Sequence, residues 1–222
     1  MVNGLYTGYR DNGIGNGKKI TVSGEGSVFA APNQATATVG VRTENQNLQR
    51  AQAENAEKSN AMLAALRNLG IAKDDIKTAD FRIDPIYTYE DGKQLFQGYR
   101  VTHLYNITIR NIAQAGLIID TAVENGANEI MNIQFSVAEP QELYNRALSM
   151  AVVDSYNKAQ TVARTLGLQT SISPLTITEE TQKGSPGPFL VASLDTSSGS
   201  GTPIEPGKLE IKATVTGTYI SS

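Results

Sequence analysis

The sequence predicts an α+β protein in which helices pack on one face of a mostly antiparallel sheet. Several segments alternate apolar and polar residues, most regularly 208–219. Other segments repeat apolar residues at helical spacing, including one long helix near 140–166. A glycine ends each expected helix, at Gly70, Gly126 and Gly167, and an expected strand follows each time.

The first two expected strands lie on either side of a turn at Pro32 and Asn33. Strand 20–28 places two glycines, Gly24 and Gly26, on its apolar face. Because glycine within a strand costs about 0.5–1 kcal/mol relative to alanine, we expect a helix or an aromatic ring to lie against the backbone there. Strand 35–42 then alternates small apolar residues with polar ones.

A helix over 47–69, capped by Asn45 or Asn47, leads into a long hairpin. The arms of the hairpin are 76–89 and 98–110, and its tip carries Asp91 and Gly92. Pro85 predicts an edge strand or a bulge in the first arm, because proline cannot donate a hydrogen bond to a neighbouring strand.

The second half of the chain continues with a short helix at 113–125 and strand 129–138. That strand is expected to place Met131, Ile133, Phe135 and Val137 on one face. The helix that begins at Pro140 would be about 40 Å long, so we expect part of it to pack on a partner subunit. A strand near 171–180 follows. Residues 1–18 are expected to form a flexible lead-in, and 19–222 a single domain with a long Gly/Ser/Pro loop near 182–207.

Composition excludes several classes of function. The 222 residues include no cysteine and one histidine, which rules out thiolate metal sites and cysteine nucleophiles. A net charge of -3 without a basic cluster makes nucleic acid an unexpected partner. No apolar run reaches the length of a membrane span, and the first residues lack the pattern of a signal peptide.

No catalytic, cofactor or metal site is predicted. The only histidine, His103, lies in phase with the inward residues of its strand and has no evident partner for general-base chemistry. The acidic pairs Asp74-Asp75 and Glu179-Glu180 are interpreted as solvated charges.

Four aromatic residues gather near the tip of the expected hairpin and are the candidate partner or subunit contacts: Tyr87, Tyr89, Phe96 and Tyr99. The alternative is that they form cross-strand pairs that stiffen the hairpin. The sequence leaves both interpretations open.

Ordered motifs along the chain resemble the SIMPL domain family, which includes bacterial periplasmic immunogenic proteins and an oxidative-stress-defence protein. They include "ITVSGEGSVFAAPNQATATVGV", "GYRVTHLYNITIR", "RALSMAVVDSYNKAQTVARTLGL" and "IEPGKLEIKATVTGTY". The chain departs from the family at Asn33, where an acidic residue is common. The resemblance implies an α+β protein of the cell envelope that self-associates, and it supplies no catalytic residues.

Three hypotheses of function follow. The first is a non-enzymatic, self-assembling extracytoplasmic protein linked to cell-envelope or oxidative-stress defence, whose signal or anchor is absent from this chain; a cytoplasmic location is the alternative. The second is a module that binds an unknown protein or a small envelope ligand through the aromatic hairpin 86–99. The third is a hydrolase built around His103.

Overall fold

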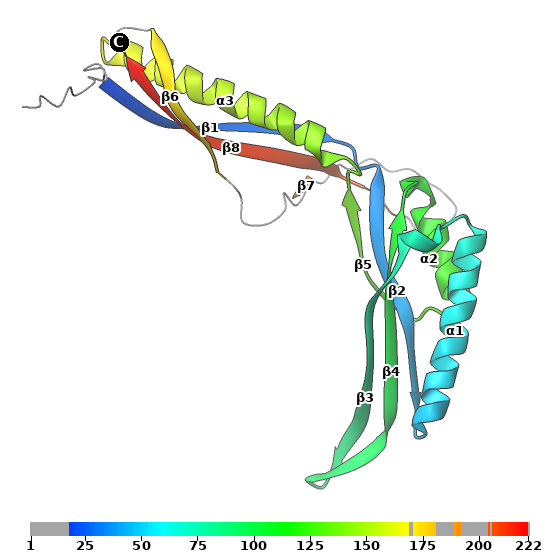
Figure 1. Ribbon diagram of the computed structural model, residues 1–222. Coiled ribbons are helices and arrows are strands. Elements are labelled where there is room, and N and C mark those ends of the chain that lie inside the picture. The colour runs from blue at the N-terminus through cyan, green and yellow to red at the C-terminus, as the bar shows by residue number, and fades with distance from the viewer. Residues whose placement is uncertain (1–17, 169–170, 181–188, 192–203, 205, 222) are drawn as a thin grey trace, which may run out of the picture. The chain divides into compact units, whose positions relative to one another are not determined.

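The computed structural model describes residues 18–168, 171–180, 189–191, 204 and 206–221 (Figure 1). The expected lead-in 1–18 lies outside this range except for Lys18, as does most of the expected loop 182–207. The helices are α1 (Leu48–Asn68), α2 (Ala115–Glu124) and α3 (Pro140–Thr165), with short 3-10 helices η1 (Lys73–Asp75) and η2 (Ile112–Gln114). The strands are β1 (Lys18–Ala30), β2 (Gln34–Asn45), β3 (Ile76–Glu90), β4 (Lys93–Ile109), β5 (Glu129–Ser136), β6 (Ile172–Glu179), β7 (Phe189–Val191) and β8 (Lys208–Ser221).

The strands form two sheets, and the predicted α+β class is confirmed. One sheet has the order β1-β8-β6, with β7 paired to β8, and the other has the order β3-β4-β2-β5. The pairs β3–β4, β2–β4 and β2–β5 of the second sheet and the β6–β8 pair of the first are antiparallel. The sequence pattern located the strands except β7, which lies within the expected loop 182–207, and did not indicate that the strands separate into two sheets.

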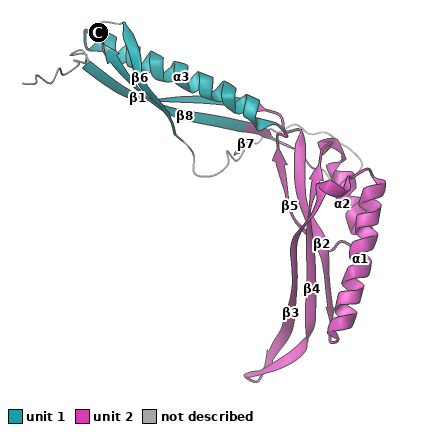
Figure 2. Ribbon diagram, in the orientation of Figure 1, with its two compact units in different colours: residues 1–29, 139–189, 210–222 teal, residues 30–138, 190–209 magenta. Residues whose placement is uncertain are grey.

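The chain divides into two compact units (Figure 2). Unit 1 comprises residues 1–29, 139–189 and 210–222, and unit 2 comprises 30–138 and 190–209. Each unit combines segments that are far apart in the sequence. The expectation of one domain over 19–222 stays a prediction.

In unit 1, α3 lies directly on β1 at the two glycines. The helix presents a stripe of small residues at four-residue spacing, all buried: Ala147, Ala151, Ser155, Ala159 and Ala163. A Cβ added to Gly24 or Gly26 would overlap the backbone carbonyl oxygen of Ala151 or Ala147, respectively. The glycines therefore let the helix backbone approach the strand backbone, as the sequence predicted.

In unit 2, α1 and α2 cover one face of the sheet. Asn47 caps α1 by accepting a hydrogen bond from the backbone N–H of Arg50, which decides between the two predicted caps. The inward residues of β2 and β4 are fully buried beneath the helices, and they are Ala35, Ala37, Val39, Val41, Val101, Ile107 and Ile109. This alternation matches the sequence pattern.

Strand β5 ends at Ser136, so that Val137 lies beyond it, and within the strand the predicted alternation fails at Met131. Ile133 and Phe135 face the core as expected, but Met131 is 64% exposed. The pairing with β2 shifts between Thr38 and Val39, so that Thr38 lies opposite Asn132 while Val39 lies opposite Ile130. The prediction that Met131 shares the core face was wrong, because this bulge inserts Met131 as an extra residue.

Candidate functional site

The hairpin of β3 and β4 extends past the rest of its sheet. The last pair between β2 and β4 joins Asn45 to Tyr99, whereas β3 and β4 remain paired as far as Glu90 and Lys93 (Figure 1). The part of β4 before Tyr99 therefore has β3 as its only paired strand among the described residues. A two-stranded ribbon has no neighbouring strand to cover its side chains.

The structure brings three of the four predicted aromatic residues into contact. The ring centroids of Tyr87 and Phe96 are 5.8 Å apart, and those of Phe96 and Tyr99 are 5.1 Å apart, both in edge-on geometry. Tyr89, the fourth, is 72% exposed and makes no ring contact with a described residue. Tyr87 and Phe96 pack on each other across the strands yet keep 45% and 48% of their surface exposed.

A bulge places Phe96 beside Tyr87. The register shifts between Ile86, which lies opposite Gly98, and Tyr87, which lies opposite Phe96. Without this shift, strict alternation from Tyr99 would turn Phe96 to the other face. Phe81 and Ile83 continue the same face toward α1 and are also exposed. We call Phe81, Ile83, Tyr87, Tyr89, Phe96 and Tyr99 the aromatic face.

His103 is half-buried and hydrogen-bonds only to hydroxyl groups among the described residues. Its Nδ1 lies 2.8 Å from the Tyr105 hydroxyl, and its Nε2 lies 3.5 Å from that of Thr78. The Phe81 ring packs edge-on against it at 4.9 Å. Burial lowers the pKa of His103, so the imidazole is neutral at pH 7. No carboxylate orients the ring, so the described residues do not form a triad of nucleophile, histidine and carboxylate.

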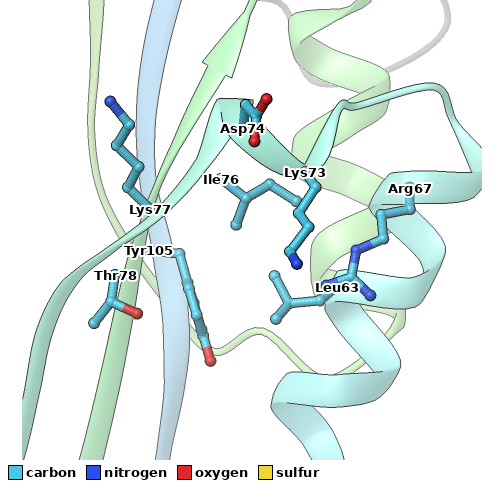
Figure 3. A pocket seen from close by; sticks show the side chains of 8 residues that line it. All are labelled: Leu63, Arg67, Lys73, Asp74, Ile76, Lys77, Thr78 and Tyr105. Carbon is cyan, nitrogen blue, oxygen red and sulfur yellow. The ribbon is translucent and has the colours of Figure 1, made fainter.

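A cleft that the sequence analysis missed lies beside the Tyr105 side chain (Figure 3). Its volume is about 600 Å³. The end of α1 contributes Leu63 and Arg67, η1 contributes Lys73 and Asp74, and Ile76, Lys77 and Thr78 come from the start of β3, with Tyr105 from β4. The fold therefore brings the end of a helix against the start of an edge strand.

The cleft carries an excess of positive charge. Arg67, Lys73 and Lys77 line it with one carboxylate, that of Asp74, and none of these four side chains makes an ion pair with a described residue. Figure 3 shows Arg67 on α1 and Lys73 on the segment that leads into β3, while the Lys77 side chain is directed away from both. In the sequence uncharged residues separate Arg67 from Lys73, and two acids separate Lys73 from Lys77, so no cluster was evident.

The neighbouring Asp75 anchors η1. Arg110 donates from Nε and Nη2 to the two carboxylate oxygens at 2.9 and 2.7 Å. This bidentate pair, above all its hydrogen bonds, lowers the pKa of the Asp75 carboxyl from its ordinary value of 3.8. The two residues of the acidic pair therefore differ: Asp75 is buried and paired with Arg110, whereas Asp74 is exposed and lines the cleft.

We expect Arg110→Gln to lower the urea midpoint of unfolding at pH 7. Because the folded pKa of Asp75 is depressed, the stabilisation by Arg110 is present above pH 3.8 and is lost as the pH falls through the lower folded value. The difference from wild type should therefore narrow between pH 5 and pH 2. Arg146→Gln, at an exposed arginine of α3, is the control. A difference that stays constant over this pH range would contradict the assignment.

The described residues contain no group of three or more His, Asp or Glu side chains that could hold a metal ion. None of the helices in the described part of the chain is long and apolar enough to cross a membrane.

A family model and individual relatives were both found in the comparison with known proteins. The model of the SIMPL family, described as "Protein of unknown function (DUF541)", matches residues 20–219. The chain is 30% identical over 164 residues to the uncharacterized protein YggE of Escherichia coli K12, which covers 74% of this chain and 66% of that protein. It is 30% identical over 155 residues to the 26 kDa periplasmic immunogenic protein of Brucella melitensis, covering 68% of this chain and 62% of that protein. The matches thus span just under two thirds of the length of these relatives.

Proposed function

Because the chain belongs to the SIMPL family, for which no function is assigned, we propose from its surface that it is a non-enzymatic protein that assembles from copies of itself through the aromatic face. One observation carries the proposal: Tyr87, Tyr89 and Phe96 stay exposed on a ribbon that extends beyond its sheet, and the exposed Phe81 and Ile83 continue the same face along the sheet. Exposed apolar patches of this kind are typical of protein interaction sites.

The side chains, rather than the edge of β3, are the expected contact between copies. Pro85 has no N–H to donate to a further strand, and the charged residues Asp80, Arg82 and Asp84 oppose pairing of two such edges. If two copies pack through this face across a two-fold axis, each copy buries the same aromatic residues against the other. The same packing would also cover Tyr89, which has no ring partner within the described chain.

The cell envelope is the proposed location. The support is the Brucella relative, which is named periplasmic. The link to envelope or oxidative-stress defence rests on the family resemblance alone. Fractionation of cells that produce the full-length protein tests the location, and recovery with cytoplasmic markers would support the alternative.

Light scattering after size exclusion tests the assembly. We expect the wild type to have a mass that is a discrete multiple of 23.8 kDa. The double variant Tyr87→Ser/Phe96→Ser should shift the protein to the monomer, or weaken association at least about tenfold, because it removes two adjacent aromatic contacts. The control Leu117→Ser/Met131→Ser removes two exposed apolar side chains elsewhere in unit 2 and should assemble as wild type.

A wild type that is monomeric at all concentrations, or a double variant that assembles as wild type, would contradict the proposal. A monomer would leave the aromatic face as a binding surface for another protein or an envelope ligand, which is the second hypothesis. Circular dichroism of each variant checks that loss of assembly is not loss of folding.

A further inference from the structure

The cleft beside Tyr105 is lined by more cations than carboxylates, and two of the cations, Arg67 and Lys73, lie at its helical side. Arg67 lies in the last turn of α1 and Lys73 begins η1, and Gly70 turns the chain between them, so that both side chains line the same cleft. Neither side chain makes an ion pair with a described carboxylate. Figure 3 shows the Asp74 carboxylate directed away from the Lys73 ammonium. An anion bound in the cleft would give these two cations a counter-charge.

The rest of the lining suits a ligand that is anionic at one end and apolar at the other. Leu63, Ile76 and the ring of Tyr105 supply apolar surface. A volume of about 600 Å³ lies within the range of sites for small molecules, roughly 300–1,000 Å³.

Thr78 supplies a hydroxyl whose orientation depends on His103. In one tautomer of His103 the hydrogen is on Nε2, and this N–H donates to the hydroxyl oxygen of Thr78. The O–H of Thr78 is then free to donate into the cleft. In that tautomer Nδ1 accepts from the hydroxyl of Tyr105, at 2.8 Å. His103 thus contacts two residues that line the cleft, Thr78 and Tyr105. A ligand that orders these two side chains therefore changes the environment of the imidazole.

We propose that this cleft binds a small molecule that carries a phosphate or carboxylate group on an apolar body, with Arg67 and Lys73 holding the anionic group. Arg67 offers a planar fork of donors and Lys73 a mobile point charge, a combination suited to phosphate oxygens. The surrounding chain has a net charge of -3, so the attraction is local to the cleft and does not come from the protein as a whole. No residue of the aromatic face lines the cleft, although Phe81 packs on His103, and the proposal does not depend on assembly.

Phenyl phosphate is the probe, and His103 is the reporter. The chain has one histidine, so its imidazole gives a single assignable set of NMR signals. We expect saturable binding by calorimetry, with movement of the His103 signals at the same concentrations. Arg67→Gln/Lys73→Gln should weaken binding by roughly tenfold or more, the effect of losing two exposed charge contacts. Both residues are exposed, so the fold should tolerate the change.

Arg50→Gln is the matched control, because Arg50 is an exposed arginine at the other end of α1. It should bind phenyl phosphate as wild type does. No saturable binding by the wild type, or equal binding by the double variant, would overturn the proposal.

Two further probes distinguish the source of the anion. Phosphatidylglycerol vesicles present the phosphate in an anionic lipid headgroup, and phosphatidylcholine vesicles, whose headgroup has no net charge, are their control. Phenyl phosphate presents the phosphate on a small molecule in solution. Retention on the anionic vesicles that the double variant loses would support a lipid ligand. Binding of phenyl phosphate without such retention would support a free anionic compound.

Discussion

Gly24→Ala is expected to destabilise unit 1 by about 2–3 kcal/mol, the cost of forcing an extra group into a packed interface. The added Cβ would overlap the carbonyl oxygen of Ala151 and lie 2.6 Å from the Cβ of Ser155. Because the nearest obstacle is helix backbone, a change of rotamer cannot relieve it, and α3 must move away from β1. The displacement would also disturb the buried bond between the hydroxyls of Ser155 and Tyr219, which are 2.6 Å apart.

Native-state hydrogen exchange measures this effect unit by unit. Opening free energies of amides in β1, β8 and α3 should fall, while those of α1 and β4 in unit 2 serve as an internal control. Ser23→Ala, at the exposed neighbour of Gly24, should leave both units unchanged. If the opening free energies of the unit 1 amides in Gly24→Ala lie within about 0.5 kcal/mol of the wild-type values, the close approach of α3 to β1 is not required for stability.

Asn55→Leu should destabilise unit 2 by about 2–3 kcal/mol, the cost of removing a buried donor from its acceptors. Asn55 is 1% exposed, and its Nδ2 donates to the carbonyl oxygens of Val41 at 2.9 Å and Val101 at 3.1 Å. One side chain of α1 is thereby joined to both β2 and β4. Leucine has a similar size, so the loss would reflect hydrogen bonding more than a cavity.

Asn60→Leu is the matched control on the same helix, because Asn60 is exposed. Asn60→Leu should leave the hydrogen-exchange rates of the β2 and β4 amides as in wild type. Asn55→Leu should raise those rates and leave the rates of the β1 and β8 amides unchanged. Equal behaviour of the two variants would show that the buried amide contributes nothing specific to the packing of α1.

Most of the secondary structure was accessible from local sequence signals. The inward residues of β2 and β4 follow the two-residue alternation that a half-buried strand requires. Pro140 and Gly167 flank α3 because each suits one end of a helix. Gly24 and Gly26 predicted a close backbone neighbour, and α3 is that neighbour.

The candidate sites were accessible only in part. Tyr87, Phe96 and Tyr99 could be grouped because they are near one another in the sequence, but a bulge is what places Phe96 on their face. The cationic cleft was not visible, because Arg67 and Lys73 are separated by five uncharged residues and line one cleft only when α1 ends against β3.

The sequence by itself determined most of the helices and strands and which side of most of them is apolar, since both depend on residues a few positions apart; β7, within the expected loop 182–207, is the exception. Tertiary structure alone decided that the strands form two sheets, that Met131 turns outward, and that Asn55 is buried as a shared donor. These features depend on register and on contacts between distant segments. A single inserted residue reverses the face of every residue beyond it, and local periodicity does not record where such an insertion is tolerated.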